Sequence, residues 1–506
     1  MNNKLIYQFS PSNTDGDKSM TDLLGGKGAN LAEMSLLGIN VPPGFTVTTE
    51  VCNYFMKHGN IPDNLDEELK QSLKNLEKTT NKIFDSDKKP LLLSVRSGGK
   101  ISMPGMMDSI LNIGINDKNL ESLSSDFNDE RFALDSYRRL IQMYGNVVLN
   151  IEMDRFEAIL DNKKRIDGVE KDNEFNPDQL RWIIDAFKTT VERFSKKSFP
   201  QDPNIQLNGA IEAVFKSWSN KRAVTYRKIN NIPDEWGTAA NVQSMVFGNL
   251  NEKSGTGVAF TRFPSTGKNK LYGEYLMNAQ GEDVVAGIRT PFPIGKHEKN
   301  TQPSLEEVNP AMYKEIKDIA DKLETHYKDV QDIEFTIEDS VVYILQTRSA
   351  KRTAQASVKI AVDMHNENLL TKEEAINMVD ANQITSVLHP QFKESSEREL
   401  FEKGLNASPG AAVGVIVFDP DTAELEAQKG RKVILVRDET SPEDIHGMFS
   451  SVGILTTKGG MTSHAAVVAR GMGKPCVAGA EKLIIDYKNK TISNSSLTLE
   501  EGDLIS

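Results

Sequence analysis

The pattern that most restricts the fold is an apolar strand that runs into two glycines and then into an alanine-rich helix. Val452 to Thr457 supply the strand and Gly459-Gly460 the turn, and the helix follows from His464 to Arg470. We expect Thr462 or Ser463 to cap this helix, because a hydroxyl accepts bonds from the first free amides. The pattern predicts an α/β layer with His464 at a helix N-terminus.

This position suits His464 to phosphoryl transfer. The partial positive charge of a helix N-terminus disfavours imidazolium, so the ring stays a neutral nucleophile, and the free N–H groups can receive a phosphoryl group. The alternative is a histidine that only packs or caps a loop. The two glycines, the paired hydroxyls and the Ala-Ala-x-x-Ala-Arg continuation favour the carrier role.

The rest of the chain reads as several α/β domains. Short strands at 413–418, 432–437 and 452–457 alternate with helices in a unit that begins near Ala407. Charged helical patterns cover 62–85 and 118–230, and apolar runs at 242–247 and 257–262 predict a long hairpin. Thr371-Lys-Glu-Glu374 has capping-box spacing, and Gln383 to Leu405 lacks periodicity, which predicts a linker.

A second group of polar residues follows two predicted strands. Alternation places Asp332 and Glu334 on one face, and pairing of Ile337 with Val341 would set Asp332 opposite Gln346, with Arg348 beside them. Two carboxylates at this spacing suit Mg²⁺ shared with nucleotide phosphates, and an arginine can bind the phosphates directly. An ordinary amphipathic hairpin with a charged outer face is the alternative.

Three further elements could complete a nucleotide site. Gly25-Gly26-Lys27-Gly28 offers a flexible turn and a cation before a helix at Ala29 to Leu37, and Arg96 ends an apolar strand. The loop from Gly248 to Gly257 could close over phosphates. Each element also has an ordinary explanation: the glycine segment as a short turn, Arg96 as an exposed arginine at a strand end, and the segment from Gly248 to Gly257 as a long loop.

Charge and cysteine content narrow the function class. A formal net charge of -12 argues against nucleic acid or an anionic membrane as a partner, because a bound polyanion needs a basic surface. Two cysteines, Cys52 and Cys476, suggest neither a disulfide framework nor a thiolate metal site, so we predict a reducing, cytoplasmic location. No targeting or membrane segment is visible in the sequence.

Four segments in this order resemble the pyruvate, phosphate dikinase family. They are Leu24-Gly-Gly-Lys-Gly-Ala-Asn-Leu-Ala-Glu-Met34, Ser94-Val-Arg-Ser-Gly98 with Ser102-Met-Pro-Gly-Met-Met-Asp108, Asn278-Ala-Gln-Gly-Glu-Asp-Val-Val-Ala-Gly287, and Gly459 to Arg470. The resemblance covers nearly all of the chain. It implies an ATP-grasp domain with a helical insertion over 1–352, a helical linker over 353–405 and a swivelling β/β/α phosphohistidine domain over 406–506.

The resemblance also implies roles for residues. Lys27, Arg96, Gln346 and Arg348 would bind ATP, and Asp332 and Glu334 would bind Mg²⁺. ATP would pyrophosphorylate His464, and inorganic phosphate would then remove one phosphoryl group to leave phosphohistidine. In plant relatives the threonine that matches Thr462 is phosphorylated to switch the enzyme off, which makes Thr462 a candidate regulatory site. A homodimer is compatible with the resemblance.

Related families fit less well. Phosphoenolpyruvate synthase usually has Arg-Thr-Cys before its histidine, where this chain has Met461-Thr462-Ser463, and Enzyme I of the sugar phosphotransferase system has no ATP-grasp domain. The family continues into a barrel that binds pyruvate and phosphoenolpyruvate, and we expect this chain, which stops at Ser506, to perform only the ATP and phosphate half-reaction. The sequence also leaves open a phosphocarrier module that acts on another protein and a catalytically silent fragment.

Overall fold

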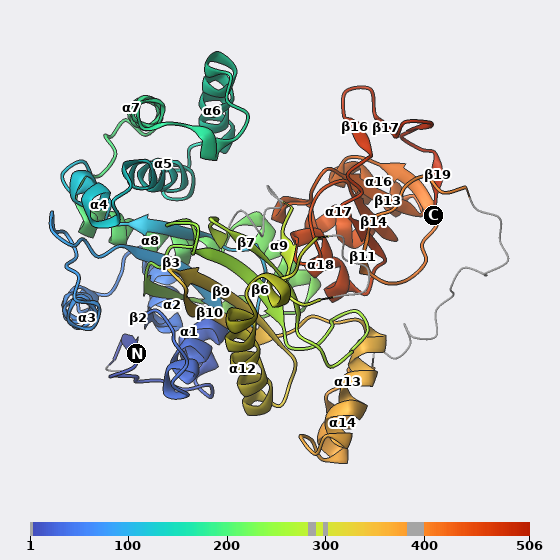
Figure 1. Cartoon of the computed structure of the whole chain (residues 1–506), viewed down its shortest axis with the longest axis horizontal. Helices are drawn as coiled ribbons and strands as arrows, with labels where there is room; N and C mark the ends of the chain where they lie inside the picture. The colour runs from blue at the N-terminus through green and yellow to red at the C-terminus, as the bar shows by residue number, and fades with distance from the viewer. Residues whose placement is uncertain (1–3, 282–289, 297–301, 382–398) are drawn as a thin grey trace. The chain divides into compact units, whose positions relative to one another are not determined.

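The structure is a computed structural model that describes residues 4–281, 290–296, 302–381 and 399–506. The chain divides into two compact units, Met1–Val246 and Phe247–Ser506. Each unit combines helices with β-sheets (Figure 1). The expected mixed α/β class is therefore confirmed.

The first unit is built on an antiparallel five-stranded sheet whose central strand is β5 (Thr238–Ser244), buried along its whole length. The order is β1 (Ile6–Phe9), β2 (Gly44–Val47), β5, β3 (Leu93–Gly99) and β4 (Ser109–Ile113). Three helices accompany the early strands, α1 (Thr21–Leu36), α2 (Thr49–His58) and α3 (Leu65–Thr80).

The predicted helical region at 118–230 is confirmed. Its α-helices are α4 (Leu120–Phe127), α5 (Glu130–Val147), α6 (Met153–Asp167), α7 (Pro177–Ser195), α8 (Pro203–Ser217) and α9 (Lys221–Ile229), with short 3₁₀ turns η1 (Asp172–Glu174) and η2 (Asp234–Trp236). Capping residues explain where α7 begins. Asn176 caps the helix by accepting a hydrogen bond from the Gln179 amide, and Pro177 occupies the first turn, where a backbone amide has no helical partner. Amphipathic helices α5 and α7 pack against each other.

The second unit begins with another antiparallel five-stranded sheet, whose central strand is β6. The order is β10 (Val341–Ser349), β9 (Gln331–Glu338), β6 (Gly255–Phe260), β7 (Tyr272–Met277) and β8 (Phe292–Pro293). The helix α12 (Pro310–Tyr327) packs on β9 and β10 (Figure 1). The remaining helices of this region are α11 (Leu305–Val308), α13 (Ala354–Asn366) and α14 (Lys372–Asn377).

The expected hairpin between 242–247 and 257–262 is wrong. Strand β5 pairs with β2 and β3 in its own sheet, whereas β6 pairs with β7 and β9. Both hydrogen-bonding edges of each strand are thus occupied by other partners. Two neighbouring apolar runs could not reveal this, because partner choice depends on strands far away in the sequence.

A six-stranded sheet carries the segment that includes His464. The order is β11 (Leu405–Ser408), β15 (Cys476–Ala478), β14 (Gly453–Thr456), β13 (Val433–Arg437), β12 (Gly414–Val417) and β19 (Leu504–Ile505). Strands β12 to β15 are mutually parallel and are joined by α16 (Pro420–Gln428), η3 (Pro442–Asp444) with α17 (Ile445–Ser450), and α18 (His464–Met472). The predicted strands at 413–418, 432–437 and 452–457 are confirmed.

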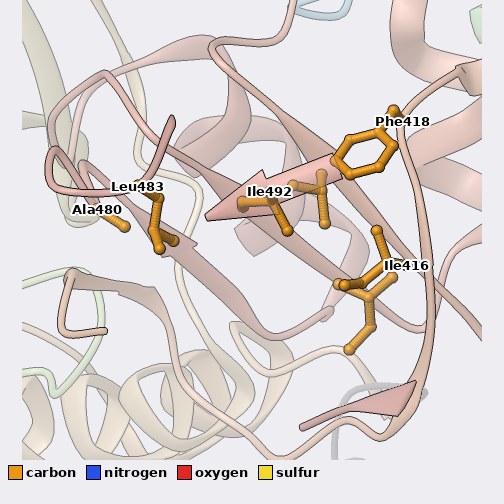
Figure 2. Close-up of a cluster of buried hydrophobic side chains, with 7 residues drawn as sticks. Ile416, Phe418, Ala480, Leu483 and Ile492 are labelled. Atoms are coloured by element: carbon orange, nitrogen blue, oxygen red, sulfur yellow. The ribbon is translucent and has the colours of Figure 1, made fainter. Parts of the chain in front are cut away.

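A small apolar core joins this sheet to a three-stranded sheet of β16 (Ile484–Asp486), β17 (Thr491–Ser493) and β18 (Thr498–Glu500). Ile416 and Phe418 from the large sheet pack with Ala480, Leu483 and Ile492 (Figure 2). Each of these side chains is nearly inaccessible, so their burial supports the sheet that holds the His464 turn.

The capping box at Thr371 is confirmed: the Thr371 hydroxyl accepts from the Glu374 amide and the Glu374 carboxylate accepts from the Thr371 amide. Most of the expected linker from Gln383 to Leu405 lies outside the described residues.

Candidate functional site

The His464 turn is shaped by two glycines and by a buried arginine. Gly459 has φ +91, a conformation that favours glycine, and Ser463 ends the turn as the N-cap of α18. At the other end of the helix, Arg470 donates to the Met461 carbonyl at 2.7 Å and to the Ala407 carbonyl at 2.8 Å. The arginine therefore ties the helix to its own entry turn and fixes the position of His464.

The two ring nitrogens of His464 have different surroundings. Nδ1 lies 3.0 Å from Thr440 Oγ1, while the enclosed Nε2 atom has no hydrogen-bond partner within the described part of the chain. Burial lowers the pKa of His464 from 6.5 to about 4. A neutral ring whose Nδ1–H donates to Thr440 would keep the Nε2 lone pair available for attack.

Thr440 was not anticipated from the sequence. It follows β13 in the run Asp438-Glu439-Thr440-Ser441-Pro442, which signals a loop and a helix start. The carboxyl ends of neighbouring parallel strands share one sheet edge, and β13 pairs with β14, which leads to His464. A prediction that β13 and β14 are neighbouring parallel strands would therefore have placed Thr440 near His464.

The expected polar face on β9 and β10 is present, although its predicted register is wrong. Val342 pairs with Ile337, and a bulge between Ile344 and Gln346 shifts the later pairs, so that Gln346 pairs with Glu334. Arg348 pairs with Asp332 in the same ladder. The bulge adds one residue that alternation alone cannot reveal.

Hydrogen bonds join the four polar side chains in two pairs. Arg348 Nε donates to Asp332 Oδ2 at 2.8 Å, and Gln346 Nε2 donates to Glu334 Oε1 at 3.2 Å. Burial raises the pKa of Asp332 despite the nearby Arg348 guanidinium, and Asp332 Oδ1 is a buried oxygen with no hydrogen-bond partner in the described ranges. A cation would satisfy this oxygen.

The donors fit magnesium better than a protein-enclosed metal. Among the described residues there is no group of three or more His, Cys, Asp and Glu side chains arranged to hold a metal. Asp332 and Glu334 would leave most of an octahedral shell to phosphates and water, an arrangement typical of Mg²⁺ in nucleotide sites.

Lys27 and Arg96 form a second group, within the first unit. The helix α1 includes the glycine turn that we expected to precede it, and it is kinked at Gly25, where φ is 64 and ψ is 166. A Cβ on Gly98 would lie 3.2 Å from the Cβ of Lys27, and Arg96 shares that face of β3 because it is two residues away. Lys27 and Arg96 therefore lie on one side of the sheet.

Glu274 is a further residue that the sequence analysis missed. Through Val258 on β6, Glu274 lies in one cross-strand row with Glu334 and Gln346, so the three share a sheet face. Its carboxylate accepts hydrogen bonds from the Met461 amide and the Thr462 hydroxyl. The acid in the β7 segment Tyr272-Gly-Glu-Tyr275 was the available signal.

In the described segments, we find no helix with the length and apolar character needed to cross a bilayer.

The second unit combines a sheet face bearing carboxylates and an arginine with a histidine at a helix start. Such a combination is typical of α/β proteins that bind or transfer phosphoryl groups.

Sequence comparisons agree with this class. The family model "Pyruvate phosphate dikinase, AMP/ATP-binding domain" matches residues 21–86, 72–306 and 293–369, and "PEP-utilising enzyme, mobile domain" matches 430–505. The chain belongs to the pyruvate, phosphate dikinase family.

Relatives from distant organisms have similar sequences. The chain is 52% identical to pyruvate, phosphate dikinase of Rhizobium meliloti, 50% identical to that of Clostridium symbiosum and 49% identical to that of Entamoeba histolytica. In each comparison 99% of this chain is covered, and it spans 56%, 57% and 56% of the respective relative. The chain therefore spans little more than half the length of these relatives.

Proposed function

We propose that this chain performs the ATP- and phosphate-dependent half of the pyruvate, phosphate dikinase reaction, with His464 as the covalent carrier. The full reaction converts ATP, pyruvate and phosphate into AMP, phosphoenolpyruvate and diphosphate. The observation that carries the proposal is the His464 ring, whose Nδ1 is held by Thr440 while Nε2 has no hydrogen-bond partner among the described side chains and backbone groups.

In the first step, Nε2 attacks the β-phosphorus of ATP. A bond forms between nitrogen and phosphorus, the bond from that phosphorus to the α,β-bridging oxygen breaks, and AMP leaves. Inorganic phosphate then attacks the terminal phosphorus of the pyrophosphohistidine. The bond from that phosphorus to the bridging oxygen breaks, diphosphate leaves and phosphohistidine remains. Attack by Nε2 gives a phosphorylated ring that is a cation while Nδ1 keeps its proton and is neutral once that proton passes to water.

Four side chains would bind the nucleotide. Lys27, Arg96, Gln346 and Arg348 would donate to its phosphates. Mg²⁺ would be held by Asp332 and Glu334, where it would neutralise the charge that develops on the phosphates. The buried, unpartnered Oδ1 of Asp332 supports this assignment.

The domain assignment is part of the proposal. We infer that 1–352 is an ATP-grasp domain, that 353–405 is a helical linker and that 406–506 is a β/β/α phosphohistidine domain that swivels. The parallel strands β12 to β15 with their connecting helices, and the match of 430–505 to a mobile domain, support the third assignment.

Radiolabelled ATP tests the carrier. Incubation with Mg²⁺ and ATP labelled at the β-phosphate should give base-stable, acid-labile protein label, and added phosphate should release AMP and diphosphate. His464→Asn should bind ATP and remain unlabelled. His446→Asn is a matched control in the same sheet domain, since His446 contacts Asp421 and lies outside the site. Label on the His464→Asn protein would refute the assignment.

A further inference from the structure

Asn241 is a polar residue in the middle of β5, the central strand of the first sheet, and 0% of its surface is exposed. Asparagine is uncommon in strands, and a buried amide is unfavourable unless its oxygen and nitrogen find hydrogen-bond partners. Asn241 Oδ1 accepts from the Thr46 hydroxyl at 2.9 Å, and Nδ2 donates to the Arg96 carbonyl at 3.3 Å. The amide therefore joins β5 to the strands on both of its sides.

The register places these three residues in one row across the sheet. Asn241 pairs with Thr46 on β2 and with Arg96 on β3. Directly opposite residues of antiparallel strands point their side chains to the same face, so the side chains of Thr46, Asn241 and Arg96 share a face. The amide thus lies between β2 and the strand that carries the proposed phosphate-binding Arg96.

Helix α1 crosses this row at close range. A Cβ on Gly28 would lie 2.8 Å from Asn241 Oδ1 and 2.7 Å from Thr46 Oγ1, so a side chain at Gly28 would overlap both groups. A Cβ on Gly98 would lie 2.6 Å from Asn241 Nδ2 and 3.2 Å from the Lys27 Cβ. The two glycines therefore allow the helix segment that carries Lys27 to lie directly against the amide.

We propose that Asn241 is a positioning residue for ATP binding, whose amide fixes Arg96 through its backbone carbonyl and Lys27 through the close packing of α1. This inference rests on the proposed function, in which both cations bind the ATP phosphates. Because Asn241 is fully buried, it acts through these two cations and does not touch the nucleotide. Two cations that donate to one chain of phosphates need a defined separation, and a displacement of about 1 Å can slow a reaction about a hundredfold.

The alternative is a buried asparagine that only stabilises the first sheet. A positioning residue changes the dissociation constant for ATP and the labelling rate of His464 in protein that is fully folded. A residue with only a structural role lowers the melting temperature, while the folded fraction keeps both values. Binding and labelling are therefore measured well below the melting temperature of each variant.

Asn241→Leu removes both hydrogen bonds and nearly preserves the size of the side chain. We expect the dissociation constant for MgATP, measured by calorimetry, to rise by about tenfold or more, because displaced cations lose contacts with the phosphates. Thr46→Val should have a smaller effect, and in the Asn241→Leu background it should have no further effect, because the Thr46 hydroxyl acts through the amide. Effects that multiply, or an unchanged dissociation constant in Asn241→Leu, would overturn the proposal.

A second double-mutant cycle tests whether Asn241 acts through Lys27. Lys27→Ala by itself should weaken ATP binding, because a contact with phosphate is lost. If Asn241 positions Lys27, then Lys27→Ala should weaken binding less in the Asn241→Leu background than in the native chain. Independent, multiplying effects of the two changes would show that Asn241 does not position Lys27 and would overturn the proposal.

Asn119→Leu is the matched control. Asn119 is a buried asparagine of the same unit whose Oδ1 accepts from a backbone amide at 3.0 Å and whose Nδ2 donates to a backbone carbonyl at 2.7 Å. It follows the end of β4, whereas Arg96 pairs with Ser109 at the start of that strand. We expect Asn119→Leu to lower the melting temperature and to leave the dissociation constant for MgATP unchanged. An equal rise of this constant would assign the effect of Asn241→Leu to general loss of a buried amide.

Hydrogen exchange distinguishes failure of this inference from failure of the proposed function. In protein with ¹⁵N-labelled asparagine, the Asn241→Leu variant identifies the side-chain amide signals of Asn241. Burial and the bond to the Arg96 carbonyl should slow exchange of these hydrogens at least about a hundredfold relative to an exposed asparagine. If ATP never labels the native chain but these hydrogens are protected, the proposed function fails and the amide bridge stands. If ATP labels His464 while the protection is missing, the positioning role fails and the carrier function stands.

Discussion

Lowering the pH from about 7.5 to about 5.5 should leave His464 neutral, in contrast to an ordinary histidine. Burial lowers the pKa of His464 to about 4, and its Nδ1 contacts Thr440 rather than a carboxylate that would stabilise the imidazolium. The nucleophilic form of the ring should therefore persist in mild acid.

The expected contrast follows from the two pKa values. With a pKa of about 4, roughly 97% of His464 is neutral at pH 5.5; with an ordinary pKa of 6.5, roughly 9% would be neutral. Protonation of His464 should then slow single-turnover labelling by less than a tenth between pH 7.5 and 5.5, whereas an ordinary histidine would slow it about tenfold.

The titration can be followed directly by NMR of protein labelled with ¹³C at histidine Cε1. The chain has 7 histidines, and His464→Asn identifies the resonance that belongs to His464. His446→Asn, with its exposed contact to Asp421, is the control. A midpoint near 6.5 for the His464 resonance would refute the reasoning, whatever the labelling rate.

The same pKa difference links folding to pH. The folded pKa lies below the unfolded value, so the unfolded chain binds more protons, and stability falls as the pH falls from about 6.5 toward 4. At pH 5 the loss attributable to His464 is at most about 2 kcal/mol, and His464→Asn should remove it. Urea unfolding of both proteins at pH 7.5 and 5 measures the difference.

Three other changes have defined outcomes. Glu334→Ala should slow labelling of His464 by about a hundredfold or more, because the variant positions Mg²⁺ less well. An unchanged labelling rate over a Mg²⁺ titration would show that Glu334 is not a metal ligand. Thr462→Asp should abolish ATP-dependent labelling, because a second carboxylate would face Glu274, and full labelling would exclude regulation by a charge at Thr462. Gly25→Ala should destabilise the first unit by about 3 kcal/mol or more, because the added Cβ would lie 1.8 Å from the Gly98 carbonyl oxygen. Chemical unfolding measures this loss. A loss below about 1 kcal/mol would show that the backbone at the α1 kink adapts to the side chain.

Local patterns were enough to locate the central chemical groups. The strand, glycine turn and alanine-rich helix around His464 are encoded within about twenty neighbouring residues. Ser463 occupies the expected N-cap position, but its hydroxyl makes no capping hydrogen bond in the described part of the chain. Alternation correctly placed Asp332 and Glu334 on one face, because neighbouring side chains of a strand must point to opposite sides. Both predictions depend only on short-range backbone geometry.

The tertiary structure decided which distant groups meet. The bulge before Gln346 set the true pairing of Asp332 with Arg348, and sheet topology brought Thr440 to His464. Glu274 meets Thr462 across 188 positions of sequence, where Gly460 leaves room for its carboxylate. No local pattern contains these partners, because strand order and packing between sheets are determined by the burial of the whole unit rather than by the preferences of neighbouring residues.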